Sequence, residues 1–173
     1  MVTFTEAELI AWLSPLFWPF IRVLALFSAL PVLGQRSVPA RVRVGLSVLI
    51  VVAAQASLPP MPQVALDSAL AFMLVAQNVV IGLTLGFAVR IVFAAVEFAG
   101  ELIGLQMGLN YAGFFDPASG GQATAPSRFF GTVVGLLFIV INGHLLVVAA
   151  LVQSFHAFPV GPEPFGLLRA LFS

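Results

Sequence analysis

Two pairs of side chains have types and spacings that could carry chemistry. Glu97 and Glu101 lie four residues apart, as do carboxylate ligands of metals in helix bundles. His144 and His156 lie 12 residues apart in one apolar stretch. Neither pair is accompanied by a Glu-x-x-His partner, and two isolated histidines make a poor zinc site. We therefore expect packing or hydrogen-bonding roles for these residues, with no metal site and no cofactor.

The familiar catalytic motifs are missing as well. The sequence contains no phosphate-binding glycine loop, no G-x-S-x-G, no H-E-x-x-H and no cysteine. Without cysteine, thiolate nucleophiles, disulfides and thiolate metal sites are all excluded. The residues thus predict a protein that is not an enzyme.

The composition indicates a membrane or membrane-complex protein. Of the 173 residues, 61% are hydrophobic and only 8% are charged, whereas about a quarter are charged in soluble domains. Most of the exterior must then face lipid or other protein. The formal net charge is zero, so there is no electrostatic footprint for nucleic acid. All seven basic residues are arginine, which suits either a packed complex or a GC-rich genome.

The elements that must position these residues are apolar stretches of uneven length, which predict an all-α protein with one domain over residues 1–173. They run over about 9–32, 44–58, 64–96 and 129–157, and residues 165–172 begin a further helix. At about 1.5 Å per residue the second is too short and the third too long for an upright span. Such helices should pack against protein as much as lipid. The basic loop 34–43 is expected on the cytoplasmic side, with the N-terminus outside.

One helical face in the third stretch collects glycines and charges. At 100° per residue, the eight residues of this polar stripe share a face about 100° wide; they are Gly82, Gly86, Arg90, Glu97, Gly100, Glu101, Gly104 and Gly108. Small residues four apart let another helix approach closely. We favour a helix–helix seam containing one internal ion pair, and the alternative is a face that lines a transport path.

Bulky aromatic residues precede a turn-forming segment after this helix. Tyr111, Phe114 and Phe115 are followed by Asp116-Pro117 and a Ser-Gly-Gly run, which is strong turn chemistry. In a membrane protein the aromatics are either interfacial anchors or a hydrophobic plug in a passage. The residues by themselves favour the anchor.

Three blocks of sequence resemble the FliR family of flagellar biosynthetic proteins and its type III secretion counterparts. These are RVLALFSALPVLGQRSVPARVR at 22–43, AGELIGLQMGLNYAGFFDPASG at 99–120, and the segment from Asn142-Gly143-His144 to Pro159-Val160-Gly161. The resemblance covers the N-terminal two thirds of the family pattern. Family members continue through further apolar helices, so we expect a C-terminally truncated chain.

The resemblance implies a fold of hydrophobic helical hairpins in a membrane-associated export gate. The partners would be FliP-like and FliQ-like gate subunits and an FlhB-like cytoplasmic export protein, with unfolded flagellar proteins as substrates. The location would be the bacterial inner membrane, at the flagellar basal body. In the family the loop after GLQMGL projects into the passage, so the resemblance implies a plug made of Tyr111, Phe114, Phe115, Asp116 and Pro117.

Two alternatives stay open. The chain could belong to a virulence-type secretion gate, which the same blocks also resemble. It could instead be a subunit of a small-molecule transporter or channel, with Arg90, Glu97 and Glu101 as a coupling or selectivity site.

Overall fold

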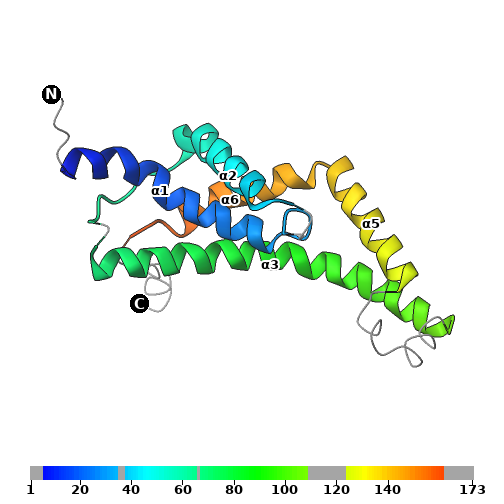
Figure 1. The fold of residues 1–173 in the computed structure, drawn as a ribbon. Coiled ribbons are helices and arrows are strands. Elements are labelled where there is room, and N and C mark those ends of the chain that lie inside the picture. Colours follow the sequence, from blue (N-terminus) through cyan, green and yellow to red (C-terminus); the bar gives the residue numbers. More distant parts are fainter. Residues whose placement is uncertain (1–5, 35–37, 66, 109–123, 162–173) are drawn as a thin grey trace, which may run out of the picture. The chain divides into compact units, whose positions relative to one another are not determined.

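The computed structural model describes residues 6–34, 38–65, 67–108 and 124–161, and within them every regular element is a helix. The α-helices are α1 (Glu6–Ala29), α2 (Ala40–Ala54), α3 (Ala69–Gln106), α5 (Ala125–Val140) and α6 (Gly143–Ala157) (Figure 1). A 3-10 turn, η1 (Gln55–Ser57), follows α2. The prediction of an all-α fold is confirmed.

Several of these helices are long and apolar enough to cross a membrane. Among the described residues three pass by length and composition: Trp12–Ala29, Ala40–Ser57 and Ala69–Gln106. The second stretch is thus long enough, contrary to expectation, because its helix begins four residues earlier than expected, at Ala40. A fourth span results if α5 and α6 count as one broken span. This pattern supports a membrane location for the chain.

The chain forms two compact units. Unit 1 comprises Met1–Phe87 with Val147–Ser173, and unit 2 comprises Ala88–Leu146. The 38-residue helix α3 contributes its first part to unit 1 and its second part to unit 2. The expectation of one domain over residues 1–173 stays a prediction.

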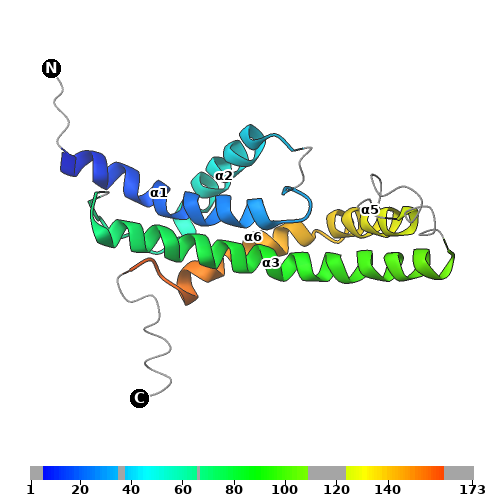
Figure 2. The same cartoon turned by 60° about the horizontal axis from the view of Figure 1, so that its bottom comes forward.

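Helix α1 provides the core of unit 1. Its buried side chains include Trp18, Arg22, Val23 and Leu26. In the second half of α1 most residues are buried, as expected for a helix surrounded by other helices rather than covered on one face. Figures 1 and 2 both show α1 running beside the first part of α3. The Trp18 indole N–H donates to Pro62 O at 3.1 Å. This bond ties the uncharged loop after η1 to the core.

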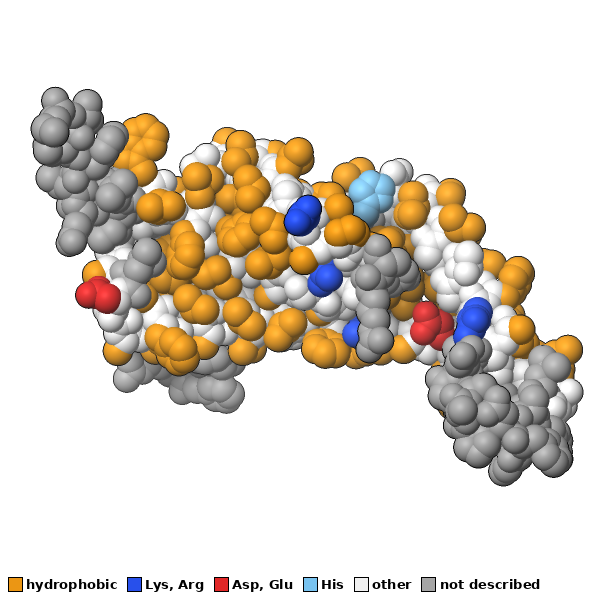
Figure 3. All heavy atoms as spheres, in the orientation of Figure 1, with side chains coloured by type: hydrophobic (Ala, Val, Ile, Leu, Met, Phe, Trp, Pro, Cys, Tyr) orange, Lys and Arg blue, Asp and Glu red, His pale blue; other side chains and the backbone are white. Residues whose placement is uncertain are grey.

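Helix α2 packs on α1 but leaves most of its surface exposed. It begins after Pro39 and buries only Ser47 and Val51, while many of its apolar side chains are exposed. Figure 3 shows hydrophobic side chains gathered over α1 and α2 with few charges among them. Such a surface requires lipid or protein cover.

Unit 2 is an antiparallel hairpin of α3 and α5. Gly104 lies against Thr124, Gly100 against Ser127, and Phe93 against Phe138, so the contacts run in opposite chain directions. Thr124 is the N-cap of α5, and its side chain accepts a hydrogen bond from Ser127 N. Pro126 occupies the first turn, where its missing N–H has no cost.

The apolar stretch expected over 129–157 is divided between two helices. Helix α5 ends at Val140, and Asn142 adopts a positive φ of 56° before α6 begins at Gly143. Asn and Gly favour this kind of turn, and a Cβ on Gly143 would collide with the Phe138 ring. The single apolar stretch of the sequence therefore forms two helices, divided at the Asn-Gly pair. The expected helix at 165–172 lies outside the described residues.

Candidate functional site

A buried arginine organises unit 1 through hydrogen bonds to two other segments. Arg22 is fully buried in α1; its Nε donates to Asn78 Oδ1 of α3 at 2.9 Å. Its Nη1 donates to Ser154 O at 2.9 Å and Ser154 Oγ at 3.1 Å, and its Nη2 donates to Phe158 O at 3.0 Å. The guanidinium carbon lies 3.9 Å from the centre of the Phe155 ring. We call Arg22, Asn78, Ser154, Phe155 and Phe158 the Arg22 cluster.

The charge of Arg22 is balanced by neutral groups. The four acceptors that the described residues supply are uncharged, and two are main-chain carbonyls at the end of α6. These carbonyls carry the negative end of the helix dipole, which favours a cation. The Phe155 ring adds a cation–π contact. The cluster therefore satisfies a buried cation and fixes the end of α6 against α1 and α3.

Two glycines of the polar stripe allow α3 to approach α1 within unit 1. A Cβ on Gly82 would collide with Arg22 O and lie 2.8 Å from Ala25 Cβ. A Cβ on Gly86 would lie 2.5 Å from Ala29 Cβ and 2.9 Å from Leu26 O. Because real Cβ atoms do not approach so closely, only glycine fits at these positions. This α1–α3 seam places Asn78 beside Arg22.

The next two glycines of the stripe serve the hairpin of unit 2. A Cβ on Gly100 would lie 2.8 Å from Ser127 Cα, and one on Gly104 would lie 2.8 Å from Thr124 Oγ1. Ser127 Oγ also donates to Glu97 O at 3.1 Å. The glycine spacing thus serves two different helix contacts, one in each unit.

A carboxylate closes the base of this hairpin. Glu101 Oε2 accepts from Thr124 Oγ1 at 2.9 Å and from Thr124 N at 3.3 Å. An anion beside the first turn of α5 is favoured by the helix dipole. We call Glu101, Gly104 and Thr124 the hairpin latch.

The remaining stripe residues are more exposed. Arg90 and Glu97 are both exposed, and they are separated by about 10 Å along the helix axis. In the described part of the chain no ion pair joins Arg90 to Glu97 or Glu101. Gly108 has a φ of 72° where the chain leaves α3, a conformation typical of a glycine that ends a helix. The function of the stripe as a seam or a path stays a prediction.

The other candidate residues lie either outside the described residues or at the surface. The plug candidates Tyr111, Phe114, Phe115, Asp116 and Pro117 lie outside the described residues. His144 and His156 are exposed, and His156 Nε2 lies 3.0 Å from Ser57 O.

Sequence reasoning missed the Arg22 cluster. The useful signal was an ionisable residue inside an apolar helix, which should have a polar partner in another helix. Asn78, in the third apolar stretch, was a visible candidate for that partner.

Comparison with known proteins identifies relatives over nearly the whole chain. Residues 13–173 match the family model described as "Bacterial export proteins, family 1". The flagellar biosynthetic protein FliR of Escherichia coli strain K12 is 45% identical over 164 residues, which cover 95% of this chain and 62% of that protein. FliR of Pectobacterium carotovorum subsp. carotovorum is 41% identical over the same shares.

A more distant relative shows the same pattern. FliR of Bacillus subtilis strain 168 is 33% identical over 159 residues, covering 87% of this chain and 61% of that protein. The chain thus spans about three fifths of the length of the curated relatives it matches. These relatives are named for flagellar biosynthesis, and the matching family model is described by export. The expected resemblance to FliR is confirmed.

Proposed function

The chain belongs to the bacterial export proteins, family 1, and on that premise we propose that it is part of a FliR-like subunit of the flagellar protein export gate. The observation that carries the proposal is the similarity to FliR proteins over 95% of the chain. In this role the chain contributes to the channel through which unfolded flagellar proteins leave the cell. It carries out no chemical reaction.

The packing of helices within each unit supports a structural role of this kind. Glycines bring α3 close to α1 in unit 1 and to α5 in unit 2, and van der Waals packing of small residues is a main source of helix association in membranes. Large apolar side chains remain exposed on α2, α3 and α5. A subunit of a larger membrane complex would bury such surfaces against other chains and lipid.

The partners follow from the family rather than from the chain alone. We assign FliP-like and FliQ-like subunits as neighbours in a hetero-oligomer, and an FlhB-like protein on the cytoplasmic side. The location is the bacterial inner membrane at the flagellar basal body. The apolar helices that could span a membrane support this location.

The plug role belongs to this proposal as well. An export gate must pass an unfolded chain and still hold back ions when idle, and an apolar constriction can do so by excluding water. Tyr111, Phe114 and Phe115 supply bulky groups for this purpose, followed by Asp116-Pro117. Gly108 and the hairpin latch hold the two helix ends between which these residues lie.

Co-purification tests the proposal against its competitor. The full-length protein, carrying an affinity tag, is co-expressed with the FliP-like and FliQ-like proteins encoded in the same genome and extracted in mild detergent. We expect both proteins to co-elute with it in one hetero-oligomer. A homo-oligomer that excludes them and conducts a small solute in liposomes would contradict the proposal and support the transporter.

A further inference from the structure

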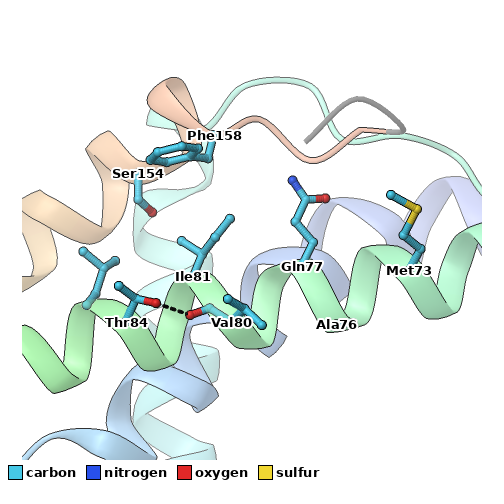
Figure 4. A pocket seen from close by; sticks show the side chains of 9 residues that line it. Met73, Ala76, Gln77, Val80, Ile81, Thr84, Ser154 and Phe158 are labelled. Atoms are coloured by element: carbon cyan, nitrogen blue, oxygen red, sulfur yellow. Dashed lines mark hydrogen bonds between the residues drawn. The ribbon is translucent and has the colours of Figure 1, made fainter. Parts of the chain in front are cut away.

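A groove runs along α3 within unit 1, on the face next to the α1–α3 seam. Its volume is about 460 Å³. Seven of its lining residues come from α3 at helical spacing, from Met73 to Leu85, and the opposite wall is Ser154 of α6 and Phe158 just after it (Figure 4). The α3 wall extends over about 18 Å. The shape of the groove is therefore that of a helical or extended apolar segment.

The groove is too large and too apolar to be left open. An apolar cavity of about 150 Å³ holds one benzene, so the groove has room for about three side chains of leucine or phenylalanine size. One buried polar atom at the groove also needs a hydrogen-bond donor. Gln77 Oε1 is buried and has no hydrogen-bond partner among the described residues, although Gln77 Nε2 donates to Pro159 O at 3.3 Å. An occupant should therefore bring apolar side chains and one N–H or O–H donor.

The end of α6 and the residues just after it lie beside this groove. Arg22 holds Ser154 O and Phe158 O, and Gln77 holds Pro159 O. Phe158 itself forms part of the groove wall, and Val160 is buried. Figure 4 shows the Gln77 side chain reaching from α3 toward the segment that follows Phe158. The last described residues, which end at Gly161, therefore lie beside the groove.

We infer that the groove is the docking site for the chain's own segment 165–172. Phe165 is six residues beyond Pro159, which an extended chain spans in about 20 Å, so the whole groove is within reach. The segment FGLLRALF carries the apolar groups that the groove requires. Pro164 immediately precedes Phe165. A helix that begins at Phe165 would leave its first main-chain N–H groups without partners inside the helix. One of these N–H groups is the donor for Gln77 Oε1.

Cysteine cross-linking tests this assignment directly, because the chain contains no cysteine. Thr84 is exposed at the edge of the groove, so Thr84→Cys should leave the core intact. It is combined in turn with a cysteine at each position from 165 to 172 in the full-length protein, and each variant is oxidised mildly in detergent. A disulfide requires Cα atoms within about 7 Å. Intact mass and peptide mapping separate intrachain from interchain bonds.

We expect intrachain disulfides at positions three or four residues apart, which mark the face of the segment that enters the groove. Phe72→Cys is the matched control, because Phe72 is exposed on α3 but does not line the groove; it should give little intrachain product. Interchain disulfides from Thr84→Cys would overturn the inference in favour of a second copy. No disulfide in a protein that elutes like wild type would overturn it in favour of lipid or another subunit.

Discussion

Arg22 and Asn78 lie 56 positions apart in the sequence and form a fully buried hydrogen bond of 2.9 Å between α1 and α3. Asn78 Nδ2 donates to Leu74 O of its own helix, so its Oδ1 is directed to the guanidinium. The pair links the glycine seam to the end of α6, because Arg22 also binds Ser154 O and Phe158 O. The Arg22 guanidinium thus joins three segments of unit 1, which are α1, α3 and the end of α6.

The first prediction concerns Arg22. Arg22→Lys should destabilise the protein nearly as much as Arg22→Met, because one ammonium group cannot bond Asn78, Ser154 and Phe158 together. Hydrogen bonds to charged groups contribute about 1.5–3 kcal/mol each, so we expect a loss of about 3 kcal/mol or more. The measurement is the melting temperature of tagged protein in heated detergent extracts, followed by size-exclusion chromatography.

Arg41→Met is the control for Arg22, because Arg41 is exposed in α2. It should leave the melting temperature within a degree or two of wild type. If Arg22→Lys behaves like Arg41→Met, the Arg22 cluster does not stabilise unit 1.

The second prediction concerns the α1–α3 seam. Gly82→Ala should destabilise by about 1–3 kcal/mol, the usual cost of overpacking, because its Cβ collides with the main chain at Arg22 O. Gly45→Ala meets nothing within 4 Å in α2 and should stabilise by up to about 1 kcal/mol through helix propensity. The two melting temperatures should therefore shift in opposite directions. A rise in both melting temperatures would show that helix propensity, not close packing, decides the effect at Gly82.

The third prediction concerns the hairpin latch. Thr124→Val removes the N-cap of α5 and the hydroxyl that donates to Glu101; loss of a cap costs about 1 kcal/mol. We expect faster hydrogen–deuterium exchange in the first turn of α5, around Ser127. Thr132→Val removes only a bond to the preceding turn of the same helix and should leave that exchange unchanged. Equal exchange in the two variants would mean that the latch does not hold the hairpin.

The fourth prediction concerns the plug. Deleting residues 111–122 from the full-length protein should leave the gate assembled but leaky, because the apolar groups that exclude water are gone. The measurement is the uptake of small ions or dyes by cells that co-express the sister subunits, with assembly checked by co-purification. Assembled gates that stay tight to ions would restore the interfacial-anchor interpretation of Tyr111, Phe114 and Phe115.

Helical spacing predicted which positions of α3 must be small, but not which helices they would meet. Gly82, Gly86, Gly100 and Gly104 are all buried. Their partners lie in α1 and at the start of α5, and such pairing is decided by the tertiary fold rather than by periodicity. The same limit applies to Arg22, whose acceptors at Ser154 and Phe158 are more than 130 positions away.

The Asn-Gly break and the stripe charges show two further limits. Asn142-Gly143 was visible as turn chemistry, yet the hydrophobicity on either side concealed it in one stretch. Arg90, Glu97 and Glu101 share a helical face, but separation along the axis keeps Arg90 away from Glu97. Glu101 instead binds Thr124, which no helical projection of α3 alone can indicate.

Photo-cross-linking to a substrate arrested during export tests most directly whether the plug residues Tyr111 and Phe114 lie in the path of the exported protein. A photoreactive amino acid is placed at Tyr111 or Phe114 in the full-length protein, and at exposed Val48 on α2 as a control. A flagellar protein fused to a tightly folded domain is then stalled in the gate. We expect substrate cross-links from positions 111 and 114 and none from 48. An arrested substrate that never cross-links to 111 or 114, in gates shown to be assembled, would contradict it.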